Sequence, residues 1–243
     1  MILEVIAFNI QSCITIEASG AHRIELCDNP GEGGTTPSYG FIKAAREKTT
    51  IDLYPIIRPR GGDFLYSEDE FEMMKADISI CKELGCDGVV IGMLNPDGSI
   101  DKIRSSKLVQ LAYPMGVTFH RAFDRANDLQ KALEDVIEIG CERILSSGGF
   151  PDVLQGMETL EELVTLAANR IIMMPGSGVR STNIAQLAAK TGAIEFHTSA
   201  RKTITGNMVF NSPAMNENLQ TITVDEEELA KTVQVLQGIT LPG

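Results

Sequence analysis

The sequence lacks two features that would direct it to nucleic acids or membranes. Lys and Arg total 21 against 33 Asp and Glu, so the formal net charge is −12, and no stripe of basic residues interleaved with aromatics is present. A nucleic acid or an anionic membrane surface needs a positive footprint. No stretch approaches the roughly 18 consecutive apolar residues of a membrane span. We therefore expect no nucleic-acid partner and no membrane partner.

A disulfide or zinc framework is also absent. The five cysteines, Cys13, Cys27, Cys81, Cys86 and Cys141, form neither a CxxC motif nor a Cys/His pair with zinc-finger spacing. The start, MILEVIAFNI, has no basic leader and is typical of a first strand. We expect free thiols in a reducing cytoplasm, and the default role of each is that of a small buried apolar side chain.

Short β-branched runs alternate with stretches of helical periodicity along the chain, which is typical of parallel βαβ units. The predicted strands are near Leu3–Ala7, Arg23–Leu26, Leu53–Arg58, Gly88–Ile91, Val117–His120, Arg143–Ser146, Ile171–Met174 and Ile194–His197. Helical patterns include Thr36–Lys48, Glu68–Leu84, Asp128–Ile139, Leu154–Ala168 and Asn183–Lys190. Eight units predict the α/β class and one (β/α)8 TIM-barrel domain over residues 1–243, rather than an open doubly wound sheet.

One stretch fits no unit. Residues 199–223 are rich in Asn, Thr, Ser and Met and show neither period. Such a stretch is usually functional or disordered. We expect an irregular segment here, which could be a lid, a subunit contact or a mobile loop, followed by a last helix over about 225–237.

Polar residues occupy one parity of several predicted strands. Arg23 and Glu25 alternate with apolar residues, and so do Glu195 and His197. Strands of a parallel barrel are normally apolar throughout, and successive side chains point to opposite faces. The large apolar side chains must face the helices, so we expect the charged set inside the barrel. Buried ions cost several kcal/mol each unless paired, so they have partners in one another or in a ligand.

Three candidate acid or base groups follow from this pattern: Glu25, His120 and His197. The two histidines and Arg58 fall at strand ends, which is the face where barrel enzymes do chemistry. Burial and neighbours can tune such groups toward neutrality. The alternative for each histidine is a hydrogen-bonded structural residue. No Ser or Cys lies in a recognised nucleophile elbow, and no Lys lies at a predicted strand end.

The loop Arg58-Pro59-Arg60-Gly61-Gly62-Asp63-Phe64 carries two guanidiniums, which suit a carboxylate or phosphate. Internal pairing with Glu25, Glu195, Asp63 or Asp124 is the alternative. Arg121, Asp124 and Glu195 complete the charged part of the candidate ligand-binding set.

Two glycine turns follow the sixth and seventh predicted strands. The first contains Ser146 and Gly148, and the second contains Gly176 and Gly178. Barrels commonly bind phosphate in such late loops through backbone amides. A plain tight turn is the alternative for each. Phosphate binding is predicted because both turns fall at the same end of the barrel as the Arg and His residues.

Seven strings occur in collinear order over about residues 2 to 200: RIELC from Arg23, EGGTTPS from Glu32, PIIRPRGGDFLYS from Pro55, TFHRAFD from Thr118, the turn at Ser146, PGSGV from Pro175 and EFHTSA from Glu195. Together they resemble the CutC family of copper homeostasis proteins. The resemblance implies a cytosolic barrel, a homo-oligomer and a role in binding or trafficking Cu(I). Its metal ligands would be Cys27, His120 and His197, although Ile6 stands where family members often carry a second cysteine.

Three hypotheses follow. The resemblance favours a copper-handling protein. The Glu, Arg and His set favours an enzyme of unknown reaction on a phosphorylated or carboxylated small molecule, since Cu(I) prefers thiolate and thioether ligands. The third hypothesis is an oligomeric scaffold in which the charged set only stabilises the barrel.

Overall fold

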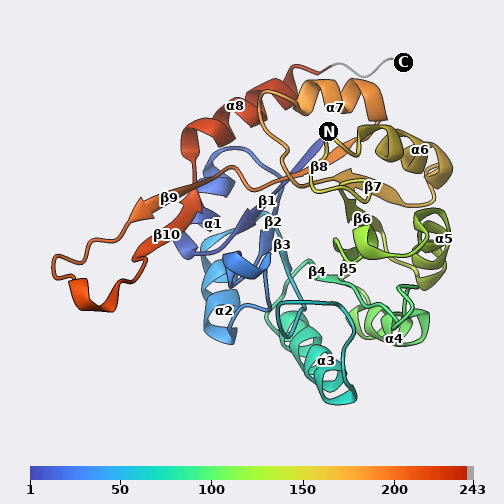
Figure 1. Ribbon diagram of the computed structural model, residues 1–243, viewed down its shortest axis with the longest axis horizontal. Helices are drawn as coiled ribbons and strands as arrows, with labels where there is room; N and C mark the ends of the chain where they lie inside the picture. Colours follow the sequence, from blue (N-terminus) through green and yellow to red (C-terminus); the bar gives the residue numbers. More distant parts are fainter. Residues whose placement is uncertain (240–243) are drawn as a thin grey trace.

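The computed structural model describes residues 1–239 and confirms the α/β class and the (β/α)8 barrel. Parallel strands surround the axis, and helices form the outer ring (Figure 1). The barrel strands are β1 (Ile2–Ala7), β2 (Arg23–Leu26), β3 (Asp52–Pro55), β4 (Gly88–Ile91), β5 (Gly116–Phe119), β6 (Arg143–Ser146), β7 (Ile172–Pro175) and β8 (Glu195–Thr198). The helices are α1 (Ile10–Ala18), α2 (Tyr39–Lys48), α3 (Glu68–Glu83), α4 (Lys102–Ala112), α5 (Leu129–Ile139), α6 (Met157–Ala167), α7 (Ile184–Thr191) and α8 (Glu226–Gln237).

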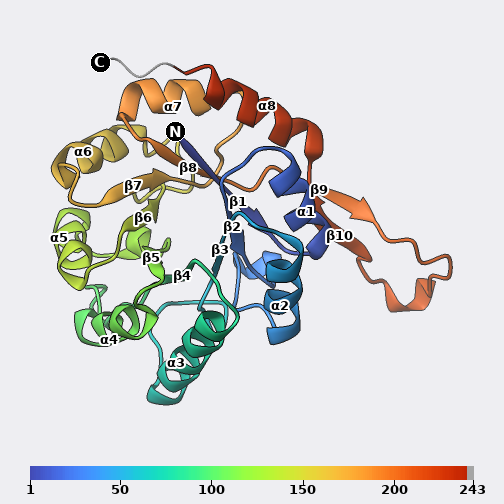
Figure 2. The ribbon, with the colours of Figure 1, turned by 180° about the vertical axis from the view of Figure 1, so that it is seen from behind.

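The strands form two four-stranded halves, ordered β3-β2-β1-β8 and β4-β5-β6-β7. The halves meet where Ile56 bridges Val90 and the Ile57 N–H donates to the Val90 carbonyl over 2.8 Å. At the other junction β7 and β8 lie side by side (Figure 2). The carboxyl ends of all eight strands therefore meet at one mouth.

Alternation along the strands separates the barrel interior from the helix layer. In β2, Ile24 and Leu26 are fully buried in the main apolar core, whereas Arg23 and Glu25 belong to a buried polar network with His197 of β8. The predicted inward-facing charged set is confirmed. The apolar side chains of the strand therefore pack against the helices, and the alternate, polar side chains point into the barrel.

The prediction for residues 199–223 was wrong in one respect. Strands β9 (Arg201–Thr205) and β10 (Gln220–Val224) pair antiparallel and form an arm that projects from the barrel (Figure 1). Both strands are short and mostly solvent-exposed, so neither needs the apolar alternation by which strands are recognised. Asn9 and Ser12 hold the base of the arm, through the Ile222 carbonyl and the Val224 N–H.

Helix α8 confirms the expected last helix, with Asp225 as its N-cap. Over the part of the chain that the structure describes, no helix has both the length and the apolar character to cross a membrane.

Candidate functional site

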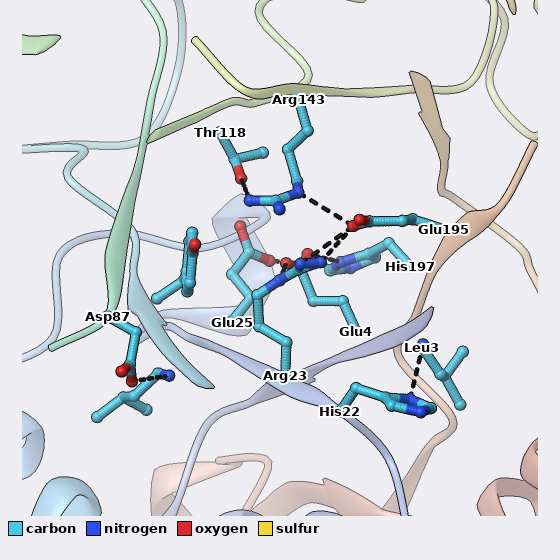
Figure 3. A network of polar contacts seen from close by, with 12 residues as sticks. Leu3, Glu4, His22, Arg23, Glu25, Asp87, Thr118, Arg143, Glu195 and His197 are labelled. Atoms are coloured by element: carbon cyan, nitrogen blue, oxygen red, sulfur yellow. Dashed lines mark hydrogen bonds and ion pairs between the residues drawn. The ribbon is translucent and has the colours of Figure 1, made fainter. Parts of the chain in front are cut away.

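The floor of the site is a charge network inside the barrel, drawn in Figure 3. Arg23 is its centre: Nε donates to Glu4 Oε2 over 2.9 Å, and Nη1 donates to Glu195 Oε2 over 3.0 Å. Arg143 reaches the same Glu195 oxygen through its Nε over 3.1 Å. All four side chains are buried. Because ions at this depth need partners, the pairing accounts for their presence in the core.

His197 joins the floor to the mouth. Its Nδ1 lies 2.7 Å from Glu4 Oε1, and its Nε2 lies 3.8 Å from Glu25 Oε2. Burial opposes protonation, but the Glu4 hydrogen bond and the charges of Glu25 and Glu4 outweigh it and raise the pKa of His197. Burial would likewise raise the pKa of Glu4, yet the bond to His197 and the Arg23 charge hold it below its usual value. Both shifts favour the imidazolium–carboxylate form of the pair.

Glu25 behaves in the opposite way. Burial raises its pKa to about 7, with a further contribution from the Glu4 charge, although His197 opposes the shift. A carboxyl group with this pKa is present in both protonation states near neutral pH. That is the property a general acid or base needs.

A cavity of about 220 Å³ lies above this floor at the barrel mouth. Its lining includes the predicted residues Glu25, Arg58, His120, Arg121, Gly178 and His197, together with Ile6, Phe8, Gly33, Ile56, Phe64, Leu145, Ser177, Ser199 and Arg201. The structure thus brings all three candidate acid or base groups to one cavity.

His120 is a neutral imidazole in the cavity wall. Burial and the Arg58 charge lower its pKa to about 3. The Ala122 backbone N–H donates to Nδ1 over 3.1 Å, so the ring proton is on Nε2. Among the described residues this buried Nε2 has no hydrogen-bond partner.

Arg58 and Arg60 lie two residues apart but have different partners. The buried Arg58 guanidinium donates to the Glu32, Gly34 and Gly62 carbonyls over 2.7, 2.8 and 3.0 Å, and no ion pair joins it to a carboxylate within residues 1–239. Its Nε is buried without a partner there.

Arg60 is not among the cavity residues. Its Nε donates to Glu70 Oε1 over 2.6 Å, and its Nη2 pairs with Asp63 at 2.9 Å. Glu70 is already fixed by the capping box that it forms with Ser67 at the start of α3. Internal pairing therefore explains Arg60, whereas Arg58 has no carboxylate partner within residues 1–239.

The turn after β6 is filled by a carboxylate of the chain itself. Asp124 accepts the Ser146 hydroxyl over 2.6 Å and the Ser147 and Gly149 backbone N–H groups over 3.0 Å. The Gly148 N–H donates to the Ser146 hydroxyl. The phosphate subsite predicted for Ser146 and Gly148 is thus occupied by Asp124, which also pairs with Arg121 at 2.7 Å.

The turn after β7 is different, because Ser177 and Gly178 line the cavity. Both adopt positive φ, at 82° and 85°. Gly176 is required for close packing: a Cβ there would lie 2.3 Å from Leu145 Cδ1 and 3.2 Å from His197 Cβ. Of the two predicted turns, only this one contributes to the cavity.

The predicted copper ligands Cys27, His120 and His197 do not form one group. Within residues 1–239, the close set of possible metal ligands is Glu4, Glu25 and His197, whose ligand atoms lie within 4.8 Å of one another. Burial and the charges of Glu25 and Glu4 raise the pKa of the Cys27 thiol well above its usual value. Since Cu(I) prefers thiolates, these residues fit a monovalent copper ion poorly.

The sequence reasoning overlooked three arginines. Arg23 was placed inside the barrel but given no site role, although it links Glu4 to Glu195. Arg143 shares its parity with the apolar Leu145, so the alternation rule gave no signal. Arg201 lies in the arm at the cavity edge, and only the unexpected strand β9 brings it there.

The chain belongs to the CutC family, whose model matches residues 1–202. A family protein CutC of Chromobacterium violaceum is 54% identical over 207 residues, which cover 85% of this chain and 84% of that protein. A human relative named copper homeostasis protein cutC homolog is 44% identical over 220 residues, covering 90% and 81%. The crystal structure of a CutC protein from Streptococcus agalactiae has a TM-score of 0.78 at 34% identity and covers 82% of this chain and 98% of that one.

Proposed function

We propose that the barrel mouth is the active site of an enzyme that acts on a small anionic molecule. One observation carries the proposal. In a chain with net charge −12, the cavity is lined by three arginines against one acidic residue, Glu25. Guanidiniums suit carboxylates and phosphates through paired N–H donors, so this local reversal of charge favours an anionic ligand.

The chemistry that the site supports is proton transfer. Glu25, with its pKa of about 7, lines the cavity and lies 3.8 Å from His197. His197 is held by Glu4, and Glu4 by Arg23. Glu25 is therefore the group that exchanges a proton with the ligand, and the floor network positions it.

Titration with inorganic phosphate and with citrate tests anion binding. The matched variants are Arg58→Met and Arg60→Met, which remove equal charges from the same loop, one at a cavity residue and one outside the cavity. We expect Arg58→Met to weaken binding about 10- to 100-fold, the value of a hydrogen bond to a charged group, and Arg60→Met to leave it unchanged. Equal affinities for all three proteins would overturn the assignment of Arg58, and no binding to the wild-type protein would overturn the proposed function.

Copper homeostasis is the second candidate, favoured by the name of the human relative. Here Cu(I) would be the cargo and Cys27, His120 and His197 its ligands. A Cu(I) competition titration with wild-type protein, Cys27→Ser and His197→Ala separates the candidates. Equally weak binding in all three would reject a direct copper site, whereas tight binding lost in either variant would favour it.

We also propose a cytoplasmic location and a homo-oligomeric state, both of which the family resemblance implies. A reducing cytoplasm is supported by five cysteines that are all buried and unpaired. Self-assembly is supported by apolar side chains exposed on the arm, where Met208, Val209 and Phe210 are each more than two-thirds exposed. Sedimentation of the purified chain tests the homo-oligomer.

A further inference from the structure

Two buried N–H donors in the cavity wall have no acceptor within residues 1–239. They are His120 Nε2 and Arg58 Nε, on side chains that are 4% and 5% exposed. Buried polar groups in native proteins nearly always have partners. The His120 exception indicates that its acceptor comes from outside the chain. The Arg58 side chain also has the buried Tyr66 hydroxyl as a neighbour, so its case rests on a buried charge that no carboxylate pairs within residues 1–239.

Both donors border the Phe64 ring, and the Arg58 charge acts on His120, since with burial it lowers the pKa of that imidazole. The ring of Phe64 lies 4.9 Å from the His120 ring centroid and also 4.9 Å from the Arg58 guanidinium carbon. Phe64 itself lines the cavity, in the loop that contains Gly61 and Gly62. A ligand that reaches past this ring would meet a cation and a neutral imidazole together.

The two donors differ in charge, so each suits a different group of a ligand. Arg58 carries a full positive charge and suits a carboxylate. His120 donates one hydrogen bond without charge, since its Nδ1 already accepts the Ala122 N–H. A neutral imidazole N–H suits a carbonyl oxygen, on which negative charge can develop during reaction.

Resting on the proposed function, we propose that the ligand is a small 2-oxo acid whose carboxylate binds Arg58 and whose carbonyl oxygen accepts the His120 Nε2–H, with Glu25 exchanging a proton at the adjacent carbon. The carbonyl and carboxylate are neighbours in such an acid, and Arg58 and His120 both border Phe64 in the wall of the cavity. The cavity of about 220 Å³ is smaller than the roughly 300–1,000 Å³ typical of pockets for drug-sized ligands, which matches an acid of a few carbons.

The proton step is balanced without a further reactant. The Glu25 carboxylate takes the proton from the carbon beside the carbonyl, and the C–H electron pair becomes the C=C bond of an enolate. The carbonyl π electrons move to the oxygen that His120 holds. Return of a proton from Glu25 to the carbon restores the ligand, and exchange of that proton with solvent makes the step observable.

Calorimetric titration with pyruvate and with propionate, which lacks the carbonyl, tests the ligand class. We expect wild-type protein to bind pyruvate about tenfold more tightly, as one net hydrogen bond allows. The preference should disappear in His120→Leu and return in part in His120→Gln, which keeps an N–H donor. Propionate binding reports on the Arg58 subsite in each variant, and circular dichroism reports on folding.

The outcomes separate the two proposals. If neither acid binds, the proposed function fails with the inference. If both bind with equal affinity, the anion site stands and the carbonyl subsite is overturned. An unchanged preference in His120→Leu also overturns it.

Deuterium exchange of the pyruvate methyl protons, followed by NMR in D2O, tests the proton step. We expect exchange with wild-type protein and a loss of at least about 100-fold in Glu25→Gln, the contribution of a positioned base. Equal exchange with both proteins, or none with the wild type, would overturn the role of Glu25.

Discussion

His197 and Glu4 lie 193 positions apart in the chain, yet His197 Nδ1 approaches Glu4 Oε1 to 2.7 Å. The contact joins the last barrel strand to the first, because β8 pairs with β1 and places these two residues opposite each other. The proton carried by His197 is therefore linked to the closure of the barrel.

This linkage predicts a pH-dependent stability. The pKa of His197 is raised from 6.5, so its contribution to the free energy of unfolding is complete below pH 6.5 and is lost as the pH rises through the folded-state pKa. The pKa of Glu4 is lowered from 4.5, so its contribution to the free energy of unfolding is complete above pH 4.5. We expect His197→Gln to reduce the free energy of unfolding most between about pH 4.5 and 6.5. Urea unfolding from pH 5 to 10 measures the difference.

His22 is the matched control, with the opposite sign. It accepts the Leu3 N–H at Nδ1, and burial, followed by the positive charges of the N-terminus and Arg23, lowers its pKa from 6.5. Its contribution is present above pH 6.5 and is lost as the pH falls. The same pH slope for His22→Gln and His197→Gln would contradict both assignments.

Glu25 should destabilise the fold at neutral and higher pH. Because its pKa rises from 4.5 to about 7, the wild-type protein loses stability relative to Glu25→Gln as the pH rises across this interval. We expect the variant to gain ~1–3 kcal/mol relative to wild type between pH 4 and 8. Denaturant titrations at the two pH values measure this, with the exposed Glu162→Gln as control. A wild-type protein that loses nothing relative to the variant would refute the raised pKa.

Arg23 should be essential to the core. Its replacement by Met leaves Glu4 without its guanidinium and removes one of the two that reach Glu195, and breaking a buried ion pair costs about 3–5 kcal/mol. Arg170→Met removes an exposed pair with Glu134 and should cost less than about 1 kcal/mol. Equal losses in unfolding free energy would show that the network contributes no more than a surface pair.

Gly92 should be intolerant of a side chain. A Cβ there would lie 2.4 Å from His120 Nδ1 and 3.0 Å from Ala122 Cβ, so Gly92→Ala must move the imidazole. We expect a cost of about 1–3 kcal/mol, as for other overpacked sites, and weaker ligand binding. Gly40→Ala meets nothing within 4 Å and should not destabilise. Unaltered binding by Gly92→Ala would mean that the position of His120 is unimportant.

The barrel could be predicted because its signal repeats in every unit. The interior of the site could be predicted at β2 and β8, where charged residues keep one parity. Arg143 escaped because Leu145 shares its face of β6, and the divergence of Arg58 and Arg60 depends on Glu70, a tertiary partner that no local pattern identifies. The arm escaped because β9 is exposed along its whole length and β10 is buried only toward its Val224 end, so neither strand has one consistently buried apolar face.

Asp124 occupies the donors of the turn after β6 that could otherwise bind an anion. Its carboxylate sits among the hydroxyl and amide donors of Ser146, Ser147 and Gly149 as a tethered ligand would, at an effective concentration of the order of millimolar or higher. A free phosphate at ordinary cellular levels would have to displace it. The chain thus carries its own competitor at this loop, so the proposed anion would meet free donors at the β7 turn and at Arg58 instead.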